Sequence, residues 1–217
     1  LGYGGSGAFD FFGHYNRALI ESDSSAVRLD HCSLHASGLD GLYASGASVA
    51  VSFCSITDNE VAGLHYAGLD PLVALTVTDN VFGGSSGTAS RIELSRNPPQ
   101  IIFARNTGTG GGFSGGFRMS GEIDADTLWD NSGSLPLVVE GGVGVATDAT
   151  LTLAPGTVVK FAGVRDVLQV AGSLQAVGTE EAPIAFTGLA DDGHGGDTNG
   201  DGASVGARGQ WGSVRIV

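Results

Sequence analysis

Hydrophobic and polar positions repeat along the first half of the chain, where two stretches superimpose at an offset of 22 residues. Like residues meet throughout this alignment, which pairs Val27, Leu29, Cys32, Ser33, Leu34, Gly41, Leu42 and Gly46 with Val49, Val51, Cys54, Ser55, Ile56, Gly63, Leu64 and Gly68. A period of this length, rich in β-branched residues, is typical of a solenoid in which each repeat is one turn of the chain. The pattern therefore predicts stacked coils of short strands.

Asparagines extend the repeat further along the chain. Each follows a large apolar residue by three positions, and the pairs are Ile56 with Asn59, Val77 with Asn80, Phe103 with Asn106 and Leu128 with Asn131, preceded by Leu34 with Ser37. The intervals between these polar positions are 22, 21, 26 and 25 residues, which fits insertions at the corners of otherwise regular coils. Because stacked coils lie roughly 4.8 Å apart, the pattern predicts a ladder of hydrogen-bonded asparagine amides. The alternative interpretation is that asparagine is merely a common turn residue.

Two cysteines share one position of the repeat. Cys32 and Cys54 lie in the same rung of adjacent predicted coils, and their alternation with Leu34 and Ile56 directs both toward the core. We favour free buried thiols, although the one-coil separation also lies within the range that a disulfide allows. No Cys-rich or His-rich spacing surrounds the pair, so it does not indicate a metal site.

Composition excludes several other classes of protein. Apolar residues make up 41% of the 217 residues, too many for a disordered chain, and the 37 glycines show no collagen period. No apolar run of 18 residues lacks a glycine or a polar break, so the sequence predicts no transmembrane segment. The net charge of −13, with Lys160 as the single lysine, argues against nucleic-acid partners. That charge suits divalent cations, although solubility alone explains it equally well.

The C-terminal third carries a distinctive succession of short motifs. They are LTLAPGTVVKF at 151–161, LQVAGSLQAVGT at 168–179, APIAFT at 182–187, DDGHGGDTNGDG at 191–202 and QWGSVRI at 210–216. This succession, with the Tyr3-Gly-Gly opening and the asparagine coils, resembles right-handed parallel β-helix proteins of large bacterial secreted and cell-surface polypeptides. The resemblance covers essentially the whole chain, and it implies a secreted or cell-surface location. It is much less specific for activity, because the group includes adhesin-like polypeptides and, more distantly, polysaccharide lyases and hydrolases.

Pattern and resemblance together predict an all-β fold, a single-stranded right-handed parallel β-helix of about nine coils with 21–26 residues each. No linker divides the chain, so we expect residues 1–217 to form one continuous segment of a longer protein. Asparagine coils would occupy 1–133, and a second coil style would occupy 134–217 with a polar loop at 189–210. In this second part strands are expected at 135–139, 149–153, 157–161, 168–170, 184–187 and 214–217.

The polar loop holds the clearest candidate for a binding site. Asp197, Asn199 and Asp201 offer oxygen ligands at alternate positions, as at the start of an EF-hand calcium loop, but Arg208 stands where that loop requires glutamate. An EF-hand is therefore excluded, and a local shell completed by backbone carbonyls is expected instead. The predicted calcium ligands are Asp191, Asp192, Asp197, Asn199 and Asp201, with His194 as a weaker candidate. The alternative is a solvated turn without an ion.

No catalytic residue is assigned from the sequence. The repeat aligns Tyr43 with His65, so these two rings are expected to stack on one outer face, where such a patch could bind sugar. Scattered surface aromatics are the alternative. The arginines that could serve a lyase fall in different frames of the repeat, and they are Arg28, Arg91, Arg96, Arg105 and Arg118.

The leading functional hypothesis is a structural or adhesive extracellular segment, either a rigid surface spacer or a filament-forming unit, stabilised by calcium. Its partners would be further copies or neighbouring segments that meet it through uncapped coil ends, with polysaccharide as a further candidate partner. The alternative is a carbohydrate-active β-helix, a polysaccharide lyase or glycoside hydrolase. An acidic groove disfavours anionic substrates unless calcium bridges them, which weakens that alternative.

Overall fold

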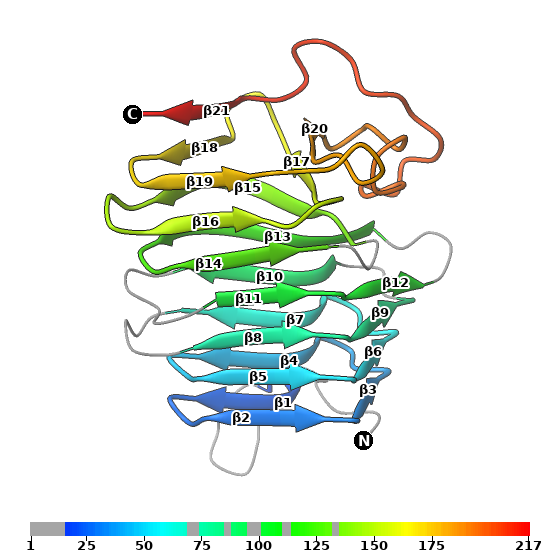
Figure 1. Cartoon of the computed structure of the whole chain (residues 1–217). Coiled ribbons are helices and arrows are strands. Elements are labelled where there is room, and N and C mark those ends of the chain that lie inside the picture. Colours follow the sequence, from blue (N-terminus) through cyan, green and yellow to red (C-terminus); the bar gives the residue numbers. More distant parts are fainter. Residues whose placement is uncertain (1–15, 69–73, 85–87, 95–100, 110–113, 132–134) are drawn as a thin grey trace.

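The protein is a parallel β-solenoid. The computed structural model describes residues 16–68, 74–84, 88–94, 101–109, 114–131 and 135–217, and within them all regular structure is strand, with no helix. The strands stack into three sheets, which form the walls of a prism whose interior is packed with side chains (Figure 1). The predicted all-β solenoid is therefore confirmed.

Each wall of the solenoid is a parallel sheet. The ten-stranded sheet holds β1 (Ala18–Asp23), β4 (Asp40–Ser45), β7 (Ala62–Ala67), β10 (Thr88–Leu94), β13 (Ser114–Ile123), β15 (Leu137–Val145), β17 (Val158–Phe161), β18 (Val167–Val170), β20 (Ala185–Gly188) and β21 (Ser213–Ile216). The seven-stranded sheet holds β2 (Val27–Asp30), β5 (Val49–Ser52), β8 (Leu75–Thr78), β11 (Ile101–Ala104), β14 (Thr127–Asp130), β16 (Thr150–Leu153) and β19 (Ser173–Ala176). The four-stranded sheet holds β3 (Ser33–His35), β6 (Ser55–Thr57), β9 (Val81–Gly83) and β12 (Thr107–Thr109).

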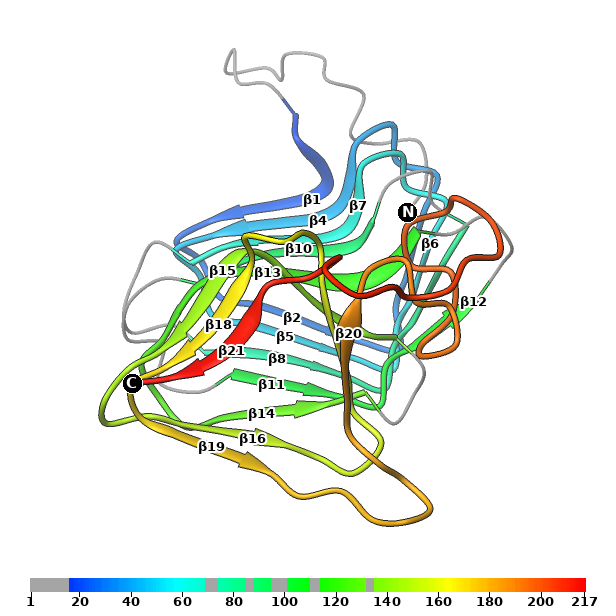
Figure 2. The ribbon, with the colours of Figure 1, turned by 90° about the horizontal axis from the view of Figure 1, so that it is seen from above.

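The coil is right-handed, and each turn adds one strand to the seven-stranded sheet. Viewed from the C-terminal end, the chain runs anticlockwise as it rises toward the viewer (Figure 2). Strand partners in the coils from β1 to β20 are separated by 20 to 27 residues, as in Phe117 with Leu137 and Arg91 with Arg118. The seven strands of one sheet are joined by six such steps, so the described residues form about six turns. The predicted number of nine was too high, because the segment between β20 and β21 makes no coil and residues 1–15 lie outside the described residues.

Alternation along the strands fills the interior with apolar side chains. In β5 and β8 the inward residues are buried and the outward ones half-buried, a period of two set by the pleat. The rings of Phe82 and Phe103 each lie 5.3 Å from that of Phe117, which comes from the opposite wall, and Trp129 is fully buried beside them in the core cluster. Burying an aromatic side chain of this size contributes about 1.5–3 kcal/mol relative to exposure.

Tight corners join the four-stranded sheet to its two neighbours, and each corner described there contains a residue with left-handed backbone. Between the seven-stranded and four-stranded sheets these residues are His31, Phe53, Asp79 and Arg105, with φ of 53°, 51°, 59° and 53°. Between the four-stranded and ten-stranded sheets they are Ala36, Asp58 and Gly84, with φ of 58°, 56° and 64°. A non-glycine residue in this region costs about 1–2 kcal/mol, so the repeated corners need compensating interactions.

At the described corners, the residue after the left-handed position supplies that compensation, as Asn59, Asn80 and Asn106 do. Asn80 donates from Nδ2 to the Val51 carbonyl at 2.9 Å and to Asn106 Oδ1 at 3.0 Å, and its own Oδ1 accepts from the Cys54 amide at 2.9 Å. Asn106 repeats the arrangement one coil later by donating to the Val77 carbonyl at 2.8 Å. The predicted amide ladder is therefore confirmed for Asn80 and Asn106, since these bonds join buried backbone groups of successive coils.

The other two asparagines of the predicted ladder lie elsewhere. Asn59 belongs to the second corner, where its Oδ1 accepts from the Ser37 amide at 3.1 Å and it stabilises a different column. Asn131 instead bonds the backbone of Val158, with its Oδ1 accepting from the amide at 2.9 Å. The prediction of one continuous ladder was wrong for two reasons. Asn59 shares its local motif, an apolar residue three positions earlier, with the other corner. Leu128, three positions before Asn131, is an outward residue of β14, so the register places Asn131 one position away from the ladder.

The two cysteines are free, as favoured from the sequence. Cys54 is buried and Cys32 half-buried, and the Cys32 amide donates to Cys54 Sγ at 3.4 Å. Burial raises the pKa of the Cys54 thiol, since a thiolate would be poorly solvated there. Both occupy the ladder position that asparagine takes in the next two coils, so a sulfur replaces the amide oxygen as acceptor.

Replacing Asn80 with alanine should lower the free energy of unfolding by about 3 kcal/mol. The change leaves the buried Cys54 amide and Val51 carbonyl without partners, and each such group costs about 1–3 kcal/mol. Urea denaturation followed by circular dichroism measures the loss. Thr76→Ala, an outward-facing change in the same coil, serves as the control. Equal losses for the two variants would contradict a structural role for the amide ladder.

Candidate metal centre

A long polar loop follows β20 and folds back against the solenoid. It spans residues 189–212 and lies beside the four-stranded and ten-stranded walls near the C-terminal end (Figures 1 and 2). One side chain of the solenoid reaches into it, since Lys160 Nζ donates to the Gly196 carbonyl at 2.7 Å and to Thr198 Oγ1 at 2.6 Å. Lys160 is 0% exposed, so the loop covers the only lysine of the chain completely.

The solenoid surface is shaped to receive this loop. Lys160 lies in an outward column of the ten-stranded sheet, directly beside Val138 on one side and Thr187 on the other. Gly116 lies under the loop, where an added Cβ would come within 3.1 Å of the Thr198 methyl group and 2.7 Å of Val138 Cγ2. A glycine is therefore required there for Thr198 to pack closely enough to accept from the lysine.

Burial and the nearby charges shift the pKa of Lys160 in opposite directions. Removal from water lowers the pKa of its ammonium group, while the nearby negative charges of Asp192, Asp191 and Asp197 raise it. Desolvation is the larger of these effects. The lysine therefore acts as an internal counter-ion for the acidic loop, at a cost in solvation that its two hydrogen bonds partly offset.

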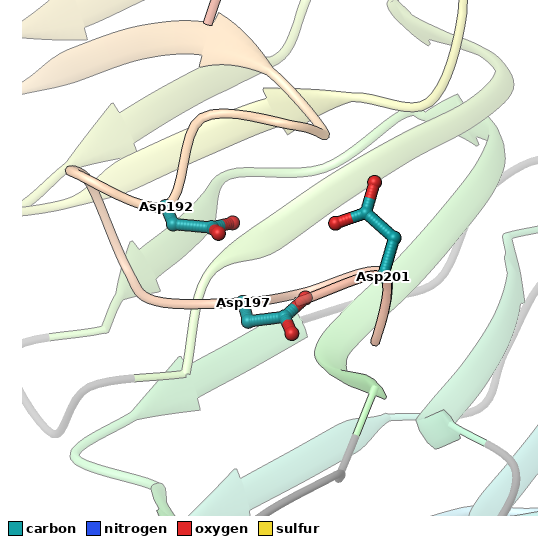
Figure 3. A group of neighbouring side chains, drawn as sticks. All are labelled: Asp192, Asp197 and Asp201. Atoms are coloured by element: carbon teal, nitrogen blue, oxygen red, sulfur yellow. The ribbon is translucent and has the colours of Figure 1, made fainter. Parts of the chain in front are cut away.

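Three carboxylates converge inside the loop. Asp192, Asp197 and Asp201 each place one oxygen within 4.8 Å of the others, and Figure 3 shows Asp192 and Asp201 on facing passes of the loop with Asp197 between them. Asp197 is held in place by the loop backbone, because its Oδ1 accepts from the Gly200 amide at 2.7 Å and its Oδ2 from the Gly202 amide at 3.0 Å. The alternating acidic pattern seen in the sequence thus produces a real cluster.

Two oxygens of the loop, one of them on Asp192 of this cluster, are buried without a hydrogen-bond partner among the described residues. They are Asp192 Oδ1 and Asn199 Oδ1. The other atoms of these groups are engaged, since Asp192 Oδ2 accepts from the Ser204 amide at 2.6 Å and Asn199 Nδ2 donates to Asp201 Oδ2 at 2.7 Å. A buried acceptor without a donor is costly, so both oxygens are suited to a cation or to water.

Asp191, the fifth predicted ligand, lies outside the group of three. Its Oδ2 accepts from Thr187 Oγ1 at 2.6 Å and contacts His194 Nδ1 at 2.8 Å. The Thr187 hydrogen bond, followed by the contact with His194, holds the pKa of the Asp191 carboxyl below its usual range. His194 is thus a partner of Asp191, and its side chain is 56% exposed.

The inner side of the loop also borders a cleft of about 780 Å³. Its lining is dominated by glycine and proline, with Glu181, Asn131 and Asp197 as the polar groups. Asn131 has its amide committed to Val158, as described above. The cleft therefore brings only two carboxylates to its surface.

The predicted contact between Tyr43 and His65 is confirmed, although the two rings meet edge to face at 5.0 Å and are not stacked. A second pair, His31 and Phe53, which was not predicted from the sequence, is stacked at 5.0 Å. The expectation that the arginines fall in different frames was wrong for one pair, since Arg91 and Arg118 lie side by side in the ten-stranded sheet. An irregularity between Thr88 and Ser90 shifts the register there, which the fixed repeat could not reveal. Arg96 lies outside the described residues.

Sequence reasoning missed the functional importance of Lys160 and Thr198. The available signal was the presence of a single lysine in an outward strand position of an acidic protein. Its loop partners lie 36 and 38 residues away in the sequence, with no repeat to connect them.

Comparisons with protein-family models, with curated proteins and with solved structures give no match to this chain. The fold and the loop define its class, a parallel β-solenoid whose acidic loop is hydrogen-bonded to a buried lysine of the sheet. None of the described residues forms a helix long and apolar enough to cross a membrane.

Titration of Lys160 should make the protein more stable in the alkaline range. Because its pKa is lowered in the folded state, the unfolded chain binds more protons between that lowered pKa and the ordinary lysine value of about 10.4. The free energy of unfolding should therefore rise with pH across this window. Urea denaturation at about pH 8 and about pH 10 measures the change.

The variant Lys160→Met isolates this contribution. Cys54 titrates with the opposite sign, because its raised pKa removes stability as pH increases, and it is present in both proteins. The change in stability between the two pH values should be more positive in the wild type than in Lys160→Met. An identical change in both proteins would show that Lys160 does not titrate as its burial implies.

Proposed function

We propose that this chain is a structural and adhesive segment of a secreted or cell-surface polypeptide, in which the solenoid acts as a rigid spacer. The observation that carries this proposal is the unbroken parallel pairing from β2 through β19 on one wall, reinforced at the corners by buried side-chain bonds. Each coil contacts chiefly its neighbours, so stiffness extends along the stack. Partners in this role are further copies or neighbouring segments that add to the coil ends.

We further propose that calcium binds in the acidic loop. Support comes from the three carboxylate oxygens within 4.8 Å of one another and from the two buried oxygens that lack partners. Calcium accepts 6–8 oxygen ligands at flexible geometry, including backbone carbonyls and water, so this set fits it better than a metal that prefers nitrogen or sulfur. The ligands would be Asp192, Asp197, Asn199 and Asp201, while Asp191 would orient His194 and Thr187.

The ion would supplement an internal cation. Lys160 already neutralises part of the loop charge and fixes Gly196 and Thr198. Calcium would therefore order the remaining part of the loop, from Asp197 to Ser204, against the solenoid. Its contribution would appear as an increase in stability that depends on ion concentration and not as a requirement for folding.

Calcium should raise the thermal unfolding midpoint relative to excess chelator. At a concentration about 100 times Kd, binding to the folded state alone contributes about 2.7 kcal/mol, or roughly 5–10 °C for a chain of this size. Differential scanning calorimetry measures the shift. Asp197→Asn and Asp201→Asn should each reduce it strongly, because each removes a charged ligand.

Asp148→Asn is the matched control for these variants, since Asp148 is an exposed acid in a turn far from the loop in sequence. It should keep the full calcium response. An unchanged midpoint in the wild type, or equal shifts in all three variants, would overturn the calcium site. Magnesium at the same concentration should give a smaller shift, because it demands stricter octahedral geometry.

A further inference from the structure

The outer face of the ten-stranded sheet carries a column of polar side chains. Strand register places Tyr43 beside His65, His65 beside Arg91, and Arg91 beside Arg118. Their neighbours along each strand are buried, so these four point outward from four successive coils. The column runs parallel to the solenoid axis and therefore crosses the strands.

Three hollows follow this column and share their walls. One of about 300 Å³ is lined by Arg17, Asp40, Tyr43 and His65, and a second of about 230 Å³ begins at the same His65. The second shares Arg91, Arg118 and Glu140 with a third of about 320 Å³. Because adjacent hollows have residues in common, they form one trough, which we call the axial trough.

One oxygen of a buried carboxylate in the axial trough lacks a hydrogen-bond partner among the described residues. Asp40 is 5% exposed, and its Oδ2 contacts His65 Nδ1 at 3.1 Å. Its Oδ1 is buried without a hydrogen-bond partner among the described residues. Leaving such an oxygen unsatisfied costs about 1–3 kcal/mol or more for a charged group, so the site favours a ligand that donates a hydrogen bond.

At the centre of the axial trough, the N–H donors of the Arg91 guanidinium have no acceptor among the described residues. Its side chain is exposed and makes no hydrogen bond or ion pair with the described part of the chain. The flanking groups are engaged, since Arg118 Nη1 lies 2.8 Å from Glu140 Oε1 and His65 Nε2 lies 3.8 Å from Glu93 Oε1. The planar guanidinium of Arg91 is therefore free to donate to a ligand.

An aromatic surface lies at the other end. Tyr43 is half-buried, with the Arg17 guanidinium 4.8 Å above its ring and His65 edge-on at 5.0 Å. Such a ring offers a rigid apolar surface with a polar hydroxyl at its tip. The axial trough thus combines the aromatic ring of Tyr43 with the acceptor Asp40 Oδ1 and the N–H donors of Arg91, both unpaired within the described part of the chain.

The charge balance selects the class of ligand. The lining contains Arg17, Arg91 and Arg118 together with Asp40, Glu93 and Glu140, so neither an anionic nor a cationic polymer meets a complementary surface. Hydroxyl groups both donate and accept, and can serve Asp40 and Arg91 at once. The coil spacing of roughly 4.8 Å is also comparable with the length of one sugar ring in an extended chain.

From these observations we infer that the axial trough binds a neutral, extended oligosaccharide lying along the solenoid axis, with Asp40, Tyr43 and Arg91 as its principal contacts. The inference rests on the proposed adhesive role and supplies its ligand class. It does not depend on the calcium site, because the trough and the acidic loop share none of these residues.

Isothermal titration calorimetry of the 217-residue chain with linear hexasaccharides tests the inference. The neutral probes are the β-1,4-glucose, β-1,4-mannose and α-1,4-glucose hexamers, and hexagalacturonate and a hexaglutamate peptide are the charged comparisons. At least one neutral hexasaccharide should bind more tightly than either charged probe. Arg91→Gln and Tyr43→Ala should each weaken that binding about tenfold or more, as is typical of central contacts.

Matched controls come from another wall of the solenoid. Arg28→Gln changes an exposed strand arginine, and Phe53→Ala removes an aromatic ring that is 55% exposed, so both should leave binding unchanged. Binding of no probe, or binding that Arg91→Gln and Tyr43→Ala leave intact, would overturn the axial trough as a site. Preference for a charged probe at the same residues would overturn the neutral ligand class.

Repeating the titration in excess chelator separates this inference from the calcium proposal. Oligosaccharide binding should persist without calcium, while the thermal shift produced by calcium should persist in Arg91→Gln. Loss of oligosaccharide binding on chelation would contradict the independence of the two sites.

Discussion

The fold depends on how the backbone turns its corners. Parallel coils can stack only if the chain turns from one wall to the next within a few residues while the buried amides and carbonyls of the corner remain hydrogen-bonded. The chain meets this requirement with a left-handed residue followed by an inward cysteine, serine or asparagine, as in Asp79 and Asn80. The strained residue costs energy, and the side-chain bonds of the next residue to the neighbouring coil offset it. Register, core and outer columns all follow from these corners.

The acidic loop is stabilised in a different way from the coils. It is held by side-chain hydrogen bonds to its own backbone, by Lys160 and, at its end, by the stacking of Trp211 on Phe161. A lysine buried in this setting is costly to desolvate, but the surrounding carboxylates would repel one another without it. Carboxylates outnumber the positive groups of this loop, which is the basis of the proposal that a divalent cation binds there.

Away from Lys160 and Gly116 under the acidic loop, the outward columns of the ten-stranded sheet are free of these structural demands. Core and corner positions use the inward side chains, so the outward positions can carry groups unrelated to folding. Stacking then converts single residues, such as Tyr43, His65 and Arg91, into an array with regular spacing. A solenoid can in this way build an extended binding surface with little effect on its core.

Sequence alone determined the solenoid, the coil length and the register over the first coils, because a fixed 22-residue repeat makes side-chain positions predictable. It also located the acidic cluster, since Asp197 and Asp201 are close along the chain. Tertiary structure alone decided that Asn59 belongs to another corner than Asn80, because both corners use one local motif. It likewise decided the pairing of Arg91 with Arg118, through an irregularity in the sheet, and the burial of Lys160 by a loop 36 residues away. Such long-range contacts depend on how coils and insertions pack in space, which no local pattern encodes.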